Sequence, residues 1–233
     1  MSHLRKTARH WIGLAAACAA LSFGGMVHAQ QPAPAAPALA AEQAMTVALS
    51  DQPIDAARLA WGHRLTKAMT MDTRLAEVLD MQLASLREQV LASLAANAPP
   101  ERKAMFIAAL DEALTGVKAE MLAKLDTGYS RYFAVSMTPA TLTELTTFYE
   151  SPLGQKAIRT PTAMTEAENQ AMGQYYIDHP AIMEGLAATI GGAMVSQRVM
   201  QQDPGALAKS FKVKLCQSLK TRGATPASCA VAG

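Results

Sequence analysis

The sequence predicts an all-α fold, an irregular multi-helix bundle built around an antiparallel helical hairpin. The chain is 50% hydrophobic but only 5% aromatic, and it is rich in Ala, Leu, Met, Glu, Gln and Lys, most of which favour helices. No run of Val, Ile and Thr alternates with polar residues as a strand would. Apolar residues instead recur at intervals of three and four, the period of an amphipathic helix.

Two long apolar stripes predict the hairpin. Asp72 is expected to cap a helix that runs to about Asn97, and Pro99-Pro100 breaks the chain before a second helix. Gly128 is expected to weaken the end of this second helix. Striped helices joined by a tight break favour antiparallel packing. The first stripe consists of Leu75, Leu79, Leu83, Leu86, Val90 and Leu94, and the second of Phe106, Leu110, Leu114, Val117, Met121 and Leu125.

Shorter helices are predicted on both sides of the hairpin. One covers residues 55–70, and others lie near 163–177, 181–201 and 205–220, bounded by prolines. Thr138-Pro139 and Ser151-Pro152 each place a capping hydroxyl before a proline in the first turn of a helix. The predicted core positions of these segments are Leu59, Leu65, Met69, Leu142, Leu145 and Phe148.

Residues 181–200 are apolar for much of their length. We interpret them as a buried helix with close packing at its glycines, and not as a membrane span, because Glu184 and Arg198 lie inside the segment.

The first 29 residues have the three parts of a secretory signal peptide. Residues 1–10 carry three basic side chains and no acid, residues 11–23 form an apolar run, and Val27-His28-Ala29 resembles a cleavage site. We predict cleavage after Ala29 and a periplasmic location, or an extracellular one if the source lacks an outer membrane. Cys18 is not expected to carry a lipid, because Ala15 occupies the position where a lipid-attachment site has Leu.

The rest of the chain is predicted to have three parts. Residues 30–53 form a Pro/Ala-rich linker and lead-in, residues 54–220 a helical domain, and residues 221–233 a tail. Cys216 and Cys229 remain after cleavage and are predicted to pair in an oxidising compartment, tying the tail to the last helix. Such a disulfide would add about 3 kcal/mol on the chain-entropy estimate.

Removing the leader changes the charge balance from 21 basic against 19 acidic residues to 18 against 19. The mature chain therefore carries no basic excess that would indicate nucleic-acid binding.

One stretch resembles a known family. In residues 138–156, Phe148-Tyr149 is followed by Ser151-Pro152, then by Gly154 and Lys156. The pattern Phe-Tyr-x-Ser-Pro-x-Gly-x-Lys is similar to that of DUF2059, a family of exported bacterial helical proteins, and the preceding helices from Arg58 onward are similar in pattern. The resemblance implies a helical fold and an exported protein, and it implies no activity.

The same six residues form the candidate site. The structural interpretation is a helix corner: Ser151 caps a helix with Pro152 in its first turn, Gly154 allows close approach, Phe148 is core and Tyr149 packs its ring. The alternative is an anion site at the helix N-terminus, assisted by Lys156.

Catalytic and metal-binding motifs are missing from the sequence. Only His63 and His179 remain after cleavage, with no nucleophile elbow, zinc motif or phosphate loop, and we predict no enzyme, cofactor or metal site. Glu166 and Glu168 are interpreted as a solvated face. The Met residues, among them Met69, Met71, Met81, Met105, Met121 and Met172, are interpreted as core filler and not as soft-metal ligands.

Three functions remain open from sequence. The first is a non-enzymatic interaction or accessory factor of the cell envelope, with a protein partner. The second is a carrier or sensor of an apolar ligand held between helices, which requires an apolar pocket. The third is an unconventional enzyme that uses Tyr149, Ser151 and Lys156 with Glu150 or Glu166. The sequence defines no oligomeric state.

Overall fold

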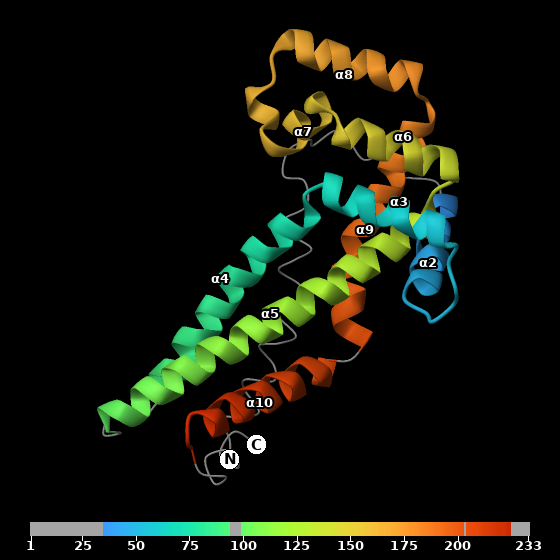
Figure 1. The fold of residues 1–233 in the computed structure, drawn as a ribbon. Helices are drawn as coiled ribbons and strands as arrows, with labels where there is room; N and C mark the ends of the chain where they lie inside the picture. Colours follow the sequence, from blue (N-terminus) through green and yellow to red (C-terminus); the bar gives the residue numbers. More distant parts are fainter. Residues whose placement is uncertain (1–34, 94–98, 203, 225–233) are drawn as a thin grey trace. The chain divides into compact units, whose positions relative to one another are not determined.

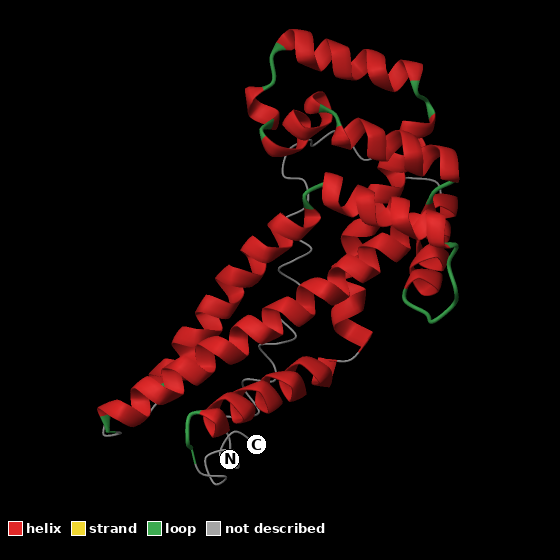
Figure 2. Ribbon diagram, in the orientation of Figure 1, coloured by secondary structure: helices red, strands yellow, loops and turns green. Residues whose placement is uncertain are grey.

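The computed structural model describes residues 35–93, 99–202 and 204–224, and Figure 1 shows their helices in chain order. Nearly all of these residues are helical, and the described ranges contain no β-strand (Figure 2). The all-α prediction is therefore confirmed. The predicted leader, Leu94 and Cys229 lie outside the described residues, so cleavage after Ala29 and the disulfide with Cys216 stay predictions.

The N-terminal part of the described chain corrects one prediction. Residues 35–48, predicted as part of an extended linker and lead-in, form helix α2 (Ala35–Ala48). Alanine has the highest intrinsic helix propensity, and the helix buries Met45 and Ala48 near its end. Arg131 fixes the chain beyond α2, because its guanidinium donates hydrogen bonds to the carbonyls of Ala48, Ser50 and Gln52 at 2.6 to 2.8 Å.

The described helices form two compact units. Within the described residues, the first unit contains residues 75–123 and the chain from residue 200 onward. The second contains the residues up to 74 and residues 124–199. Three helices, α4, α5 and α9, contribute residues to both units.

The first unit is built from α4 (Met71–Ala92), α5 (Pro100–Ser136) and α10 (Pro204–Thr221). Ion pairs join Arg87 to Asp111 and Asp80 to Lys118, each at 2.6 Å, so later residues of α4 meet earlier residues of α5. The predicted antiparallel hairpin is confirmed. Its core consists of Leu79, Leu83, Leu110, Leu114, Val117 and Met121, with Leu207, Leu215 and Leu219 from α10.

The second unit contains α3 (Ala56–Ala68), α6 (Pro139–Glu150), α7 (Pro152–Arg159), the 3-10 turn η1 (Pro161–Ala163), α8 (Glu166–Asp178) and α9 (Ala181–Gln202), together with the last part of α5. The predicted core positions Leu65, Leu142, Leu145 and Phe148 are at most 1% exposed. The largest other side chains that are fully buried in this unit are Tyr132, Phe133, Leu125, Ile182 and Val195.

Three local predictions are corrected. Helix α5 continues past Gly128 to Ser136, and at Gly128 the side chains of Val195 and Val199 of α9 occupy the space where a Cβ would lie. Helix α4 begins at Met71, so Asp72 lies within its first turn and is not its cap. Met81, predicted as core filler, is 63% exposed on the outer side of α4.

Helix α9 is buried on one side only. Its inner side carries Ile182 and Val195, both 0% exposed, and Gly185 and Gly192, which allow Leu145 of α6 and Phe133 of α5 to approach. The predicted close packing at glycine is confirmed, but the helix is not buried all round. In the part of the chain that the structure describes, no helix is long and apolar enough to cross a membrane.

Candidate functional site

The six predicted site residues form the corner between α6 and α7. Ser151 ends α6 and caps α7: its Oγ accepts a hydrogen bond from the Gly154 N–H at 3.1 Å and donates one to the Phe148 carbonyl at 2.6 Å. Pro152 occupies the first turn, where it has no N–H to leave unpaired. Thr138 starts α6 in the same way, because its Oγ1 accepts from the Thr141 N–H at 3.2 Å.

Gly154 is the position at which the corner admits no side chain. A Cβ built there would lie 2.1 Å from the Phe148 carbonyl oxygen and 2.8 Å from the Tyr149 Cα. Both are backbone atoms, which no rotamer change can move away. The two helices therefore approach each other closely because this residue is glycine.

The two aromatic residues before the corner are structural. Phe148 is 1% exposed, and its ring lies 5.1 Å from Tyr149, 5.0 Å from Tyr175 and 5.4 Å from Tyr176. These separations are typical of packed aromatic side chains. Burial raises the pKa of the Tyr149 hydroxyl, so Tyr149 is held in its neutral form. The cluster joins α6 to α8.

Lys156 has a partner that the sequence reasoning missed. Its Nζ binds both carboxylate oxygens of Glu168 at 2.6 and 2.7 Å. Glu168 also forms a capping box with Thr165 at the start of α8. The hydrogen bond from Lys156, with those from Thr165, lowers the pKa of Glu168 to about 2. Glu168 is thus not part of a merely solvated face, and the spacing Thr165-x-x-Glu168 was the sequence signal for it.

Helix α3 and the residues after it hold the corner from the other side. Arg64 forms a bidentate pair with Glu150 at 2.7 and 3.1 Å. Gln155 Nε2 donates to the carbonyls of Ala68 and Tyr149, and the Arg74 guanidinium donates to the Ile158 carbonyl at 2.6 Å. The corner is therefore tied to α3 by the Arg64–Glu150 ion pair and by the hydrogen bond from Gln155 to the Ala68 carbonyl, and to the start of α4 by Arg74.

The arrangement does not assemble the unconventional catalytic site considered above. Ser151 Oγ is committed to the backbone, and the ring of Tyr149 is buried. Lys156 and Glu150 belong to separate ion pairs, with Glu168 and Arg64 respectively. The anion-site interpretation also loses support, because Lys156 is already neutralised. The geometry favours the helix-corner interpretation.

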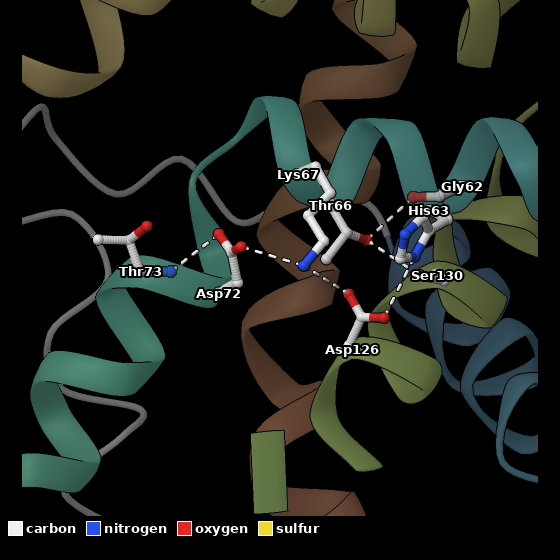
Figure 3. A network of polar contacts seen from close by, with 8 residues as sticks. All are labelled: Gly62, His63, Thr66, Lys67, Asp72, Thr73, Asp126 and Ser130. Atoms are coloured by element: carbon white, nitrogen blue, oxygen red, sulfur yellow. Dashed lines mark hydrogen bonds and ion pairs between the residues drawn. The ribbon is translucent and has the colours of Figure 1, made fainter. Parts of the chain in front are cut away.

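A second polar cluster joins α3 to α5 and to the start of α4 (Figure 3). His63 Nδ1 lies 3.1 Å from an Asp126 carboxylate oxygen, and Lys67 Nζ lies 3.0 Å from Asp72 and 3.8 Å from Asp126. The hydrogen bond to Asp72 raises the pKa of Lys67. Burial alone would raise the pKa of Asp72, but hydrogen bonds from Lys67 and Thr73 outweigh it and lower that pKa.

This cluster surrounds a strained turn. Thr70, between α3 and α4, has a φ of 55°, the left-handed region that L-residues with a side chain rarely adopt. Its N–H donates to the Lys67 carbonyl at 2.9 Å, and its own carbonyl accepts from the Arg74 N–H. The cluster thus holds the turn between α3 and the first residues of α4. Among the described residues, no group of three or more His, Cys, Asp and Glu side chains could hold a metal ion.

A hollow of about 260 Å³ lies in the first unit between α5 and α10. Its lining includes Ala113 and Gly116, and a Cβ at Gly116 would lie 3.0 Å from the aliphatic stem of Lys214. The other lining residues are Glu112, Lys214, Gln217, Ser218 and Thr221, all of which carry polar groups. A carrier of an apolar ligand requires instead a pocket lined predominantly by hydrophobic and aromatic side chains.

The outer side of α9 presents an apolar row. Met183, Ala187, Ile190 and Met194 are all exposed, and Met183, Ile190 and Met194 have exposed fractions of 56%, 69% and 45%. Their spacing of four, three and four places them along one side of the helix. The sequence did not predict this row, because α9 carries apolar residues on both sides and their periodicity does not distinguish the buried side from the exposed side.

The comparisons with known proteins agree with the resemblance at the corner. The model of a family described as "Uncharacterized protein conserved in bacteria (DUF2059)" matches residues 123–179. The matched segment contains the end of α5, the α6–α7 corner and α8, so the family recognition is confirmed over that range. No curated protein and no solved structure matches the chain significantly.

Proposed function

We propose that this protein is an exported, non-enzymatic accessory factor of the cell envelope that acts by binding another protein. The apolar row on α9 carries the proposal. Isolated exposed apolar side chains are normal on a soluble protein, whereas a contiguous row is typical of an interaction surface. Met183, Ala187, Ile190 and Met194 form such a row over twelve residues, or roughly 16 Å of helix.

The chemistry of the row favours a helical partner. Residues spaced by three and four along one helix match the anchors by which an amphipathic helix packs against another. Ala187 has a small side chain between larger ones, which would leave room for a partner side chain, and the two Met side chains can adapt their shape to it. The inner side of α9 is fully used by the protein's own core, so the outer side is free to bind without unfolding the unit.

A non-enzymatic role is supported by the corner geometry. Each candidate catalytic side chain has a structural partner, as described for Ser151, Tyr149 and Lys156. The apolar-carrier alternative is less well supported, because most residues that line the hollow between α5 and α10 carry polar groups, and aromatic side chains are packed in the core of the second unit. The proposed compartment, the periplasm or the outside of the cell, rests on the signal peptide predicted from the sequence.

Site-specific photo-crosslinking in living cells tests this proposal. A photo-reactive residue replaces Ile190 on the α9 row or, as a matched control, Asn169, which is exposed and polar on α8. A reproducible protein adduct of one mass at position 190 and not at 169, lost when Met183 and Met194 are changed to Ser, supports the proposal. An adduct with a second copy of the chain also supports it. No protein adduct at 190, or an adduct with lipid alone, overturns it.

A further inference from the structure

Helix α10 carries an unusual share of positive charge. Residues 204–221 contain Lys209, Lys212, Lys214 and Lys220 and no acid, and Arg222 follows directly. The mature chain as a whole is close to neutral, so this charge is local. The helix also has an apolar side, with Leu207, Leu215 and Leu219 packed in the core of the first unit.

The cations of α10 divide into two rows with different surroundings. On the row facing α5, Arg222 binds Glu112 at 2.9 Å, and Lys214 lies 3.9 Å from Glu120. The same two glutamates accept hydrogen bonds from Ser218 and Ser210. The cations that face α5 are therefore neutralised within the unit, and they contribute little to any external field.

The outer row has no such partners. Lys209, Lys212 and Lys220 are exposed, and within the described residues no ion pair joins any of them to an acid. At 100° per residue they lie within about 80° of one another around the helix axis. Val213, 56% exposed, lies beside this arc, about 20° beyond Lys220. The outer row thus combines three free ammonium groups, spread over roughly 16 Å, with one exposed apolar side chain.

We propose that the outer row of α10 docks the protein on an anionic phospholipid surface. The three ammonium groups would contact phosphate-bearing headgroups, and Val213 would enter the interface beside them. Lysines that surround an apolar side chain on a helix lying in the surface plane are typical of interfacial binding. The row offers no aromatic side chain on which a nucleic-acid base could stack, which disfavours a single-stranded nucleic acid.

The structure also indicates how this docking would behave. Binding is electrostatic, so it weakens steeply with salt as the Debye length falls to a few ångströms. Each lysine near an anionic surface strengthens binding by about fivefold, so three together change it by roughly a hundredfold. Because α10 keeps its apolar side in the core, the docked helix lies on the surface and does not have to leave the unit.

Vesicle cosedimentation tests the proposal with the chain from Gln30 onward, so that the apolar leader cannot contribute. The vesicles contain phosphatidylcholine alone, or phosphatidylcholine with one part in three phosphatidylglycerol. The outer-row variant carries Lys209→Gln, Lys212→Gln and Lys220→Gln. Its matched control carries Arg102→Gln, Lys103→Gln and Arg159→Gln, which remove the same charge from other helices. Circular dichroism confirms that both variants fold.

We expect the wild type to bind only the anionic vesicles, and to bind them less tightly as the salt concentration rises. The affinity for these vesicles should fall by roughly a hundredfold in the outer-row variant and by no more than a few-fold in the control. Val213→Ser should weaken binding without changing its salt dependence. Equal binding to neutral vesicles, equal loss in the control, or no binding to anionic vesicles overturns the proposal. Retention on soluble polyphosphate without vesicle binding also overturns it, and indicates a soluble polyanion as the partner.

Discussion

Replacing Gly154 by Ala tests the account of the helix corner most directly. The new Cβ would lie 2.1 Å from the Phe148 carbonyl oxygen and 2.8 Å from both the Phe148 carbonyl carbon and the Tyr149 Cα. A side chain can rotate away from an overlap, but these are backbone atoms of the preceding helix. The corner between α6 and α7 must therefore open to accept the methyl group.

The loss of unfolding free energy can be estimated from the interactions that are broken when the corner opens. Overpacking of this kind costs about 1–3 kcal/mol. Separation of the helices also loses the Ser151 cap on Gly154, worth about 1 kcal/mol, and weakens the hydrogen bond from Gln155 to the Tyr149 carbonyl, worth about another. The expected loss is about 3–5 kcal/mol, a large part of the roughly 5–15 kcal/mol that stabilises a typical domain.

Denaturant-induced unfolding, monitored by tryptophan fluorescence, measures this loss of unfolding free energy in the second unit. Trp61 on α3 is the only tryptophan left once the predicted leader is removed, and the Arg64 guanidinium lies 4.0 Å from the centre of its ring. The matched control is Gly173→Ala on α8, where a Cβ would meet no atom within 4 Å. In an exposed helix interior this change should stabilise by up to about 1 kcal/mol.

The two glycine variants are thus expected to move the unfolding midpoint in opposite directions. Equal midpoints for Gly154→Ala and Gly173→Ala would refute the reasoning, because the close approach at the corner would then not limit stability. A loss of stability in both variants would refute it as well, since general helix effects would account for the result.

Three further predictions concern contacts that the structure defines. Gly62→Ala places a Cβ 2.2 Å from the Ser130 carbonyl oxygen and should cost at least about 2 kcal/mol in the same unfolding assay. Glu168 has a pKa lowered from 4.5 to about 2, so its contribution to stability is complete above about pH 4.5 and is lost as the pH falls toward 2. The difference in unfolding free energy between the wild type and Glu168→Gln should accordingly narrow over that interval, and a difference that stays constant to pH 2 would contradict the ion pair. Arg131→Lys cannot reproduce three hydrogen bonds to carbonyls, so limited proteolysis should cut residues 49–55 faster than in the wild type, and an unchanged rate would show that the guanidinium does not hold this segment.

Much of the helix corner could be predicted from sequence because its interactions are local. Ser151, Pro152 and Gly154 act on atoms within six residues of themselves, and capping rules describe such contacts well. The pairing of Lys156 with Glu168 spans only twelve residues, and the capping-box spacing at Thr165 was visible in the sequence. It was missed because Glu166 and Glu168 were considered as a pair of acids and not as parts of a helix start.

Other features of the site depend on residues far apart in the chain. Arg64 and Glu150 are separated by 86 positions in the sequence. Arg131 and Ala48, which it holds at the end of α2, are separated by 83. Nothing in the local sequence of either pair marks the two residues as partners. Helix α2 itself was predicted as linker because its prolines and alanines alone bury little. Its burial of Met45 and Ala48 depends on neighbours supplied by the rest of the unit.

The sequence by itself determined the helical class, the antiparallel hairpin and the corner at Ser151-Pro152, because each rests on periodicity, capping or composition within a short window. The tertiary structure alone decided which side of α9 remains exposed and which lysines of α10 are neutralised. Both helices carry suitable residues on more than one side, and only the positions of Phe133, Leu145, Glu112 and Glu120 determine which side is covered. Surfaces of this kind follow from packing, since burial is a property of neighbours in space and not of neighbours in sequence.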